Sequence, residues 1–92
     1  MMQSELNKLR EEIERLDADI IAAIARRVQL ARDIGAAKRE LQLPTLDPAR
    51  EAAVVRRAVG IARDAGLAFD DEIRQIFWQL IGLSRRVQQG EA

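Results

Sequence analysis

Apolar side chains recur at alternating intervals of three and four along the first forty residues. This spacing is typical of a helix whose one face packs against other helices. No proline interrupts the run, Ser4 is suited to cap its start, and Pro44 disfavours helix at the residue before it. The pattern therefore predicts one helix over residues 5–41. Its apolar positions are Leu6, Leu9, Ile13, Leu16, Ile20, Ala23, Leu30, Ile34, Ala37 and Leu41.

A helix of this length is too long for a compact chain of 92 residues. At a rise of ~1.5 Å per residue it spans roughly 55 Å, whereas a compact domain of this size has a diameter of roughly 32 Å. The protruding apolar face would meet water unless a second chain covered it. The length of the helix therefore predicts a homodimer.

A second helix is predicted over residues 48–65. Asp47 can cap it, and Pro48 follows at the first helical position, where proline is favoured. Gly66 is a typical C-terminal cap.

A third helix is predicted over residues 71–89, because Asp70 and Asp71 suit the positive end of a helix dipole. Phe77 and Trp78 are expected to belong to its core-facing side. The expected fold is all-α, with one very long and two shorter helices in a single domain (1–92), two chains forming an intertwined helical homodimer.

Composition narrows the chemistry. Lys plus Arg and Asp plus Glu both total 15, so no net charge would attract nucleic acid or an anionic membrane. The absence of His and Cys excludes a thiol nucleophile, a histidine base and most zinc or iron sites, so neither a cofactor nor a metal is expected. No apolar run approaches a membrane span, no signal peptide is evident, and the lack of disulfides fits the cytoplasm.

Two cations of the first helix are candidates for anion binding. Arg27 occupies a position of the apolar face, where burial is costly without an anionic partner. Lys38 lies eleven residues on, nearly three turns, so both side chains point the same way and can converge on a small anion. The alternative is that Arg27 extends to solvent and Lys38 is solvated, as most cations on helix surfaces are.

The apolar stripe of the third helix ends in two uncharged polar residues. Phe77, Ile81, Ser84 and Gln88 share one face, so Ser84 and Gln88 either donate hydrogen bonds into a site or mark a solvated helix end. Arg85 and Arg86 are interpreted as an exposed basic end, which is favourable near a helix C-terminus.

Further charged residues become candidates for substrate binding only in combination with those named above. Asp47, Arg50 and Glu51 fall within about one turn, although a cap, a solvated cation and a first-turn acid would account for them. Arg10 precedes Arg27 by 17 residues, roughly 25 Å of helix. One small ligand cannot touch both in one chain, but crossing antiparallel helices of a dimer could bring Arg10 of one chain near Arg27 of the other.

These motifs together resemble the all-helical class of chorismate mutases over essentially the full chain. No single short match is specific, but seven polar positions in the right order and register are. The connection at residues 66–70 is one residue longer than in some relatives. The matching segments are Leu9-Arg10-Glu11-Glu12-Ile13 with Leu16-Asp17, Arg26-Arg27, Gly35-Ala36-Ala37-Lys38, Asp47-Pro48-Ala49-Arg50-Glu51, and Phe77 to Ile81 with Ser84 and Gln88.

The resemblance implies rearrangement of chorismate to prephenate, an early step toward phenylalanine and tyrosine, in a homodimer with shared sites. Arg10 of the partner chain and Arg27 would hold the two carboxylates, and Lys38 and Gln88 would donate to the ether oxygen. Glu51 would bind the ring hydroxyl with help from backbone near Asp47. The resemblance makes Lys38, Gln88, Arg27 and Glu51 the catalytic candidates, and Arg10, Asp47, Arg50 and Ser84 additional substrate-binding candidates.

Two other functions fit parts of the pattern. An isochorismate-pyruvate lyase, which forms salicylate, shares this fold and much of its cationic lining, although Glu51 with Ser84 favours the mutase. A non-catalytic helical dimerisation module would explain the apolar face, but it needs neither Arg27 on that face nor polar residues on the third stripe. The resemblance also leaves room for a complex with another enzyme of the aromatic pathway.

Overall fold

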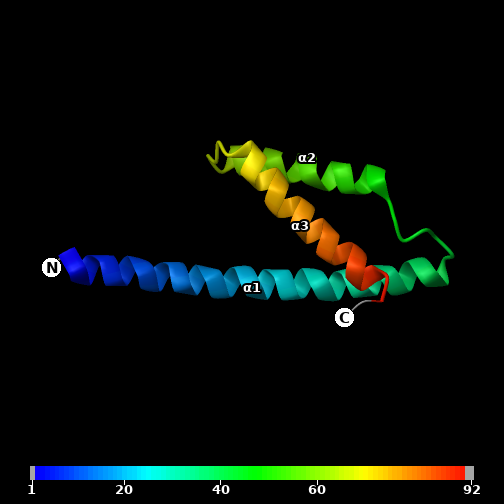
Figure 1. Ribbon diagram of the computed structural model, residues 1–92, viewed down its shortest axis with the longest axis horizontal. Helices are drawn as coiled ribbons and strands as arrows, with labels where there is room; N and C mark the ends of the chain where they lie inside the picture. Colours follow the sequence, from blue (N-terminus) through cyan, green and yellow to red (C-terminus); the bar gives the residue numbers. More distant parts are fainter. Residues whose placement is uncertain (1, 91–92) are drawn as a thin grey trace.

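The computed structural model describes residues 2–90 as three helices: α1 (Met2–Glu40), α2 (Pro48–Asp64) and α3 (Asp70–Gln88). α3 packs against both other helices and runs diagonally from the end of α2 to the C-terminal half of α1 (Figure 1). The predicted all-α fold of one long and two shorter helices is confirmed. The predicted start of α1 is wrong, because Ser4 lies inside the helix rather than capping it.

α1 ends in a capping motif built around a residue that is not glycine. The backbone N–H of Leu43 donates to Lys38 O at 2.8 Å, and that of Gln42 donates to Arg39 O at 3.2 Å. This pairing requires a left-handed residue between the helix and the loop, and Gln42 adopts it with φ 57°. The motif satisfies two of the last carbonyls of α1, Lys38 O among them.

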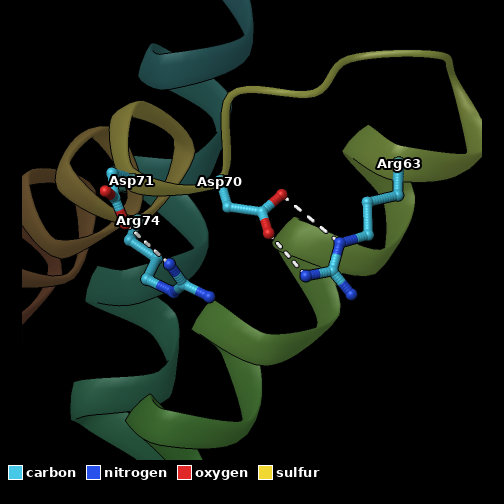
Figure 2. A network of polar contacts seen from close by, with 4 residues as sticks. All are labelled: Arg63, Asp70, Asp71 and Arg74. Carbon is cyan, nitrogen blue, oxygen red and sulfur yellow. Dashed lines mark hydrogen bonds and ion pairs between the residues drawn. The ribbon is translucent and has the colours of Figure 1, made fainter.

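The turn between α2 and α3 follows its predicted signals. Gly66 has φ 82°, and the N–H of Leu67 donates to Ala62 O at 2.9 Å, as in a glycine-capped helix end. Arg63, in the last turn of α2, then donates two hydrogen bonds to the carboxylate of Asp70 at the start of α3 (Figure 2). This pair ties the two helices together at the turn.

A glycine sets the distance between α1 and α3. A Cβ at Gly35 would lie 2.9 Å from both the Cα and the O atom of Gln88, closer than real side chains approach backbone. Gly35 is buried despite its weak helix propensity. The C-terminal end of α3 can therefore rest directly on the backbone of α1.

The single chain is elongated and has a small core. Its radius of gyration is 17.0 Å, against about 12 Å for a compact chain of this length. α1 buries only Ala31 and Gly35 among the described residues, and its N-terminal half extends beyond the other two helices (Figure 1). Trp78 is 45% exposed, so its expected core position is wrong within one chain. The core residues are Ala31, Val55, Ala58, Val59, Ala62, Ile81 and Val87.

Along residues 2–90, none of the three helices carries a stretch long and apolar enough to cross a membrane.

Candidate active site

One cavity of about 520 Å³ collects polar side chains from all three helices. Its walls also carry apolar side chains of α1, α2 and α3, so the polar groups face a partly apolar space. Seven of the eight residues that the sequence nominates line this cavity, and Arg10 lies outside it. The seven are Arg27, Lys38, Asp47, Arg50, Glu51, Ser84 and Gln88.

Arg27 is held by α3 rather than extended into solvent. Its Nη1 donates to Ser84 Oγ at 2.6 Å and to Leu80 O at 3.3 Å. Both Arg27 and Ser84 are half-buried. Neither acceptor carries a negative charge that would offset that of the guanidinium. Arg27 therefore presents a fixed cation to the cavity, and Ser84 fixes its direction.

Lys38 and Gln88 form a second cross-helix pair. Lys38 Nζ donates to Gln88 Oε1 at 2.8 Å and to Thr45 O at 2.7 Å. Because the amide oxygen of Gln88 accepts from Lys38, its NH₂ group is the end left to donate elsewhere. The backbone O of Gln88 accepts from Arg39 Nη1 at 3.0 Å. The pair thus aims two kinds of donor, an ammonium and an amide NH₂, at one region.

Glu51 accepts hydrogen bonds from Arg85, a residue that the sequence does not assign to the site. Arg85 donates from Nε to Glu51 Oε2 at 2.7 Å and from Nη2 to Glu51 Oε1 at 2.5 Å. The Arg85 side chain is 45% exposed and that of Glu51 only 13%. Arg85 is exposed at the end of α3, as the sequence predicts, but the prediction missed that it bridges α3 to α2 and lines the cavity.

The electrostatics at Glu51 follow from this pair. Hydrogen bonds from Arg85 lower the pKa of Glu51, against the raising effect of partial burial; the charge of Lys38 lowers the pKa slightly further, and Asp47 opposes it. The Glu51 carboxylate is thus ionised at neutral pH and largely neutralised by its partner.

Asp47 and Arg50 sit at the exposed start of α2. Asp47 Oδ1 accepts from the backbone N–H of Arg50 at 3.1 Å, which confirms its predicted role as the N-cap. Arg50 lines both this cavity and a neighbouring apolar one of about 440 Å³ between α2 and α3. Arg50 therefore borders both spaces, as Arg27 does.

Arg10 belongs to the exposed N-terminal half of α1, which no other described element packs against. Within one chain it cannot reach the cavity, as its separation of roughly 25 Å from Arg27 along the helix predicts.

Thr45 and Arg85 line the cavity without having been nominated. Thr45 contributes a backbone oxygen, which no side-chain pattern could indicate. Arg85 could have been suspected because its charge lies beside Ser84 in the sequence. A basic residue near a helix C-terminus, however, is already explained by the helix dipole.

The cavity suits a small dianion. Four cations and two carboxylates line it, and one carboxylate is already neutralised by Arg85. Guanidinium groups match carboxylates in charge and planar geometry. Among residues 2–90, no three acidic side chains gather as they would to hold a metal ion.

Comparison with known proteins identifies a family. The family model Chorismate mutase type II matches residues 9–89. The chain is 42% identical over 53 residues to the Intracellular chorismate mutase of Mycobacterium tuberculosis (58% of this chain, 50% of that protein). It is 35% identical over 65 residues to the 4-amino-4-deoxychorismate mutase of Streptomyces venezuelae (71% of this chain, 63% of that protein). It spans about a quarter of two longer relatives.

A solved structure is similar over nearly its whole length. It is a conserved hypothetical protein from Pyrococcus furiosus, 37% identical, with a TM-score of 0.73 over 90% of this chain and 93% of that one. The family match covers α2, α3, most of α1 and every residue that lines the cavity. The chain belongs to the chorismate mutase type II family.

Proposed function

We propose that this protein is a chorismate mutase, which rearranges chorismate to prephenate. The observation that carries the proposal is the single cavity in which Arg27, Lys38, Glu51, Ser84 and Gln88 meet from three helices. Relatives named chorismate mutase at 42% identity support it. In this rearrangement one C–O bond breaks and one C–C bond forms within the same molecule, so no proton needs to be transferred.

Catalysis of such a step consists of holding the substrate in its reactive shape and stabilising charge as it develops. Arg27, directed by Ser84, binds one carboxylate through charge-assisted hydrogen bonds. Lys38 and the amide NH₂ of Gln88 donate to the ether oxygen, which becomes more negative as its bond to carbon lengthens. Glu51 accepts from the ring hydroxyl.

The second carboxylate needs a further cation, and Arg10 of a partner chain fits this role. The N-terminal half of α1 exposes Leu9, Ile13, Leu16 and Ile20 to between 55 and 59%. Burial of each such side chain contributes about 1.5–3 kcal/mol. We therefore propose an intertwined homodimer in which the partner's α1 covers this face and the apolar cavity between α2 and α3, and brings its Arg10 to the active site.

A complementation experiment tests the shared site. Arg10→Ala and Arg27→Ala are each expected to be inactive. In their heterodimer one site carries both lesions and the other carries neither, so mixing should restore about a quarter of wild-type activity. In the control mixture of Arg27→Ala with Lys38→Ala, every site keeps a lesion and stays inactive. No recovery between chains that demonstrably exchange would refute the shared site.

The reaction itself is tested by incubating the protein with chorismate and with isochorismate. Prephenate from chorismate is the expected product, whereas salicylate and pyruvate from isochorismate would identify a lyase. If neither substrate were consumed and Arg27→Ala stabilised the dimer, the protein would be a dimerisation module.

We expect the enzyme to act in the cytoplasm, since it lacks cysteine and a relative is named intracellular. Whether it associates with another enzyme of the pathway is tested by copurification from its own cells.

A further inference from the structure

The ion pair between Arg85 and Glu51 bears on which substrate the cavity accepts. This inference rests on the proposed function. A carboxylate offers about four acceptor positions, so Glu51 can accept two hydrogen bonds from Arg85 and still accept one from a ligand. What Arg85 changes is charge. A lone carboxylate would attract a cation, whereas a carboxylate paired with a guanidinium offers an acceptor with little net charge.

The remaining charges of the cavity act in the same direction. Arg27, Lys38 and Arg50 line it as well, and Asp47 is the one other acid among its described lining residues. A ligand group that is itself cationic would therefore meet three cations in addition to Arg85. Like charges in a partly buried site repel each other far more than they would in water.

Chorismate and 4-amino-4-deoxychorismate differ in the group at ring position 4, which is a hydroxyl in the first and an amine in the second. The relative from Streptomyces venezuelae is named for the 4-amino-4-deoxy form of chorismate. An aliphatic amine is protonated at neutral pH, as the lysine side chain is, whereas a hydroxyl is neutral. Discrimination between the two compounds must act where the protein meets that group, which on the proposed function is Glu51.

We propose that Arg85 is a specificity-determining residue. By neutralising Glu51, it makes the cavity accept the 4-hydroxyl of chorismate and reject the 4-ammonium of 4-amino-4-deoxychorismate. The two hydrogen bonds from Arg85 go to different oxygens of the Glu51 carboxylate, so each oxygen keeps an acceptor position while the guanidinium offsets the charge. If Arg85 only held α3 to α2, its loss would weaken turnover of both substrates alike. The ratio of kcat/KM for the two substrates therefore distinguishes a role in specificity from a structural one.

The experiment measures kcat/KM for both compounds at neutral pH. In R85M, which keeps an unbranched side chain like the aliphatic part of arginine but removes the charged guanidinium, the ratio of amino to hydroxyl substrate should rise at least about tenfold, or about 1.4 kcal/mol. R85K, which keeps the charge, should stay within about threefold of wild type. The matched control R56M removes an exposed arginine of α2 outside the cavity and should leave the ratio unchanged.

Two further readouts keep the proposal falsifiable if R85M folds poorly. E51Q removes the carboxylate and leaves Arg85 uncompensated, so the ratio should fall, opposite in sign to R85M. In wild type the amino substrate should be used better as alkaline pH deprotonates its amine, and this gain should shrink in R85M. A ratio that stays the same in R85M and E51Q, or a wild type that prefers the amino compound, would overturn the proposal. Failure of wild type to use either compound would instead refute the proposed function and this inference with it.

Discussion

Lys38 Nζ donates a hydrogen bond to Gln88 Oε1 at 2.8 Å, and so joins the last turn of α1 to the last turn of α3. The contact fixes which end of the Gln88 amide faces the lysine. A glutamate at this position could accept from Lys38 equally well, but it would donate only when protonated.

Gln88→Glu should therefore shift the activity to acidic pH. Lys38 stabilises the ionised carboxylate, so the acid form that can donate is populated only at low pH. At neutral pH kcat should fall by at least about 100-fold, the range seen when a donor to a developing oxyanion is lost. A pH profile of kcat for wild type and variant measures this. An unchanged profile would remove Gln88 from the donor role.

Gly35→Ala should harm both stability and activity. Its Cβ would meet the backbone of Gln88 at 2.9 Å, so α3 must move outward. Such overpacking typically costs about 1–3 kcal/mol, and a misplacement of about 1 Å can cost about 100-fold in rate. Gly60→Ala is the control, because a Cβ there meets nothing within 4 Å. The control should gain about 0.5–1 kcal/mol through helix propensity. Equal thermal midpoints for the two variants would contradict the close-approach role of Gly35.

Gln42→Gly should stabilise the protein by about 0.5–1 kcal/mol. Gln42 adopts φ 57°, a conformation that glycine reaches without a steric cost from Cβ. The same substitution at Gln79, an exposed position inside α3, should instead destabilise by about 1 kcal/mol. Urea unfolding of both variants checks the opposite signs. Destabilisation by Gln42→Gly would show that its side chain contributes more than its backbone costs.

Acid should remove the stabilisation that comes from Glu51 and Arg85. The pKa of Glu51 is lowered in the folded protein, chiefly by hydrogen bonds from Arg85. Its contribution is therefore fully present above the unfolded pKa of about 4.3 and is lost as pH falls through the folded value. The difference in unfolding free energy between wild type and Arg85→Met should be largest near neutral pH and shrink below about pH 4. The ion pair of Arg63 with Asp70 is present in both proteins, so its contribution cancels in the difference between their unfolding free energies. A difference independent of pH would assign the effect to packing.

Ile13→Asp should dissociate the proposed dimer. Ile13 is 58% exposed in the single chain and would be buried twice in a symmetric assembly. Losing about 1.5 kcal/mol or more per copy weakens association by at least about 100-fold. Asn7→Asp adds the same charge at an exposed residue off the apolar face and should leave the dimer intact. Sedimentation velocity distinguishes the two; a monomeric wild type would refute the dimer altogether.

The sequence by itself determined the helices. The spacing of apolar residues, Asp47 with Pro48, and Gly66 act through local backbone and capping chemistry, which depends on neighbours along the chain. It was wrong about Ser4, because nothing prevents a helix from continuing past an acceptable cap. It also nominated Arg27, Ser84 and Gln88, because polar residues on apolar faces are visible in the sequence alone. Lys38 was nominated by its spacing from Arg27, and Glu51 by the family resemblance.

Only the tertiary structure decided how these residues pair. Arg85 and Glu51 are 34 positions apart in the chain, and they meet because α3 packs against α2. From the sequence alone, Arg85 could not be distinguished from any other exposed cation at a helix end. The role of Gly35 likewise depends on the backbone of Gln88, 53 positions later in the chain, which packs directly against it. Partners of this kind are set by where helices cross, and crossing depends on packing of all three helices at once. Local patterns carry no record of that packing.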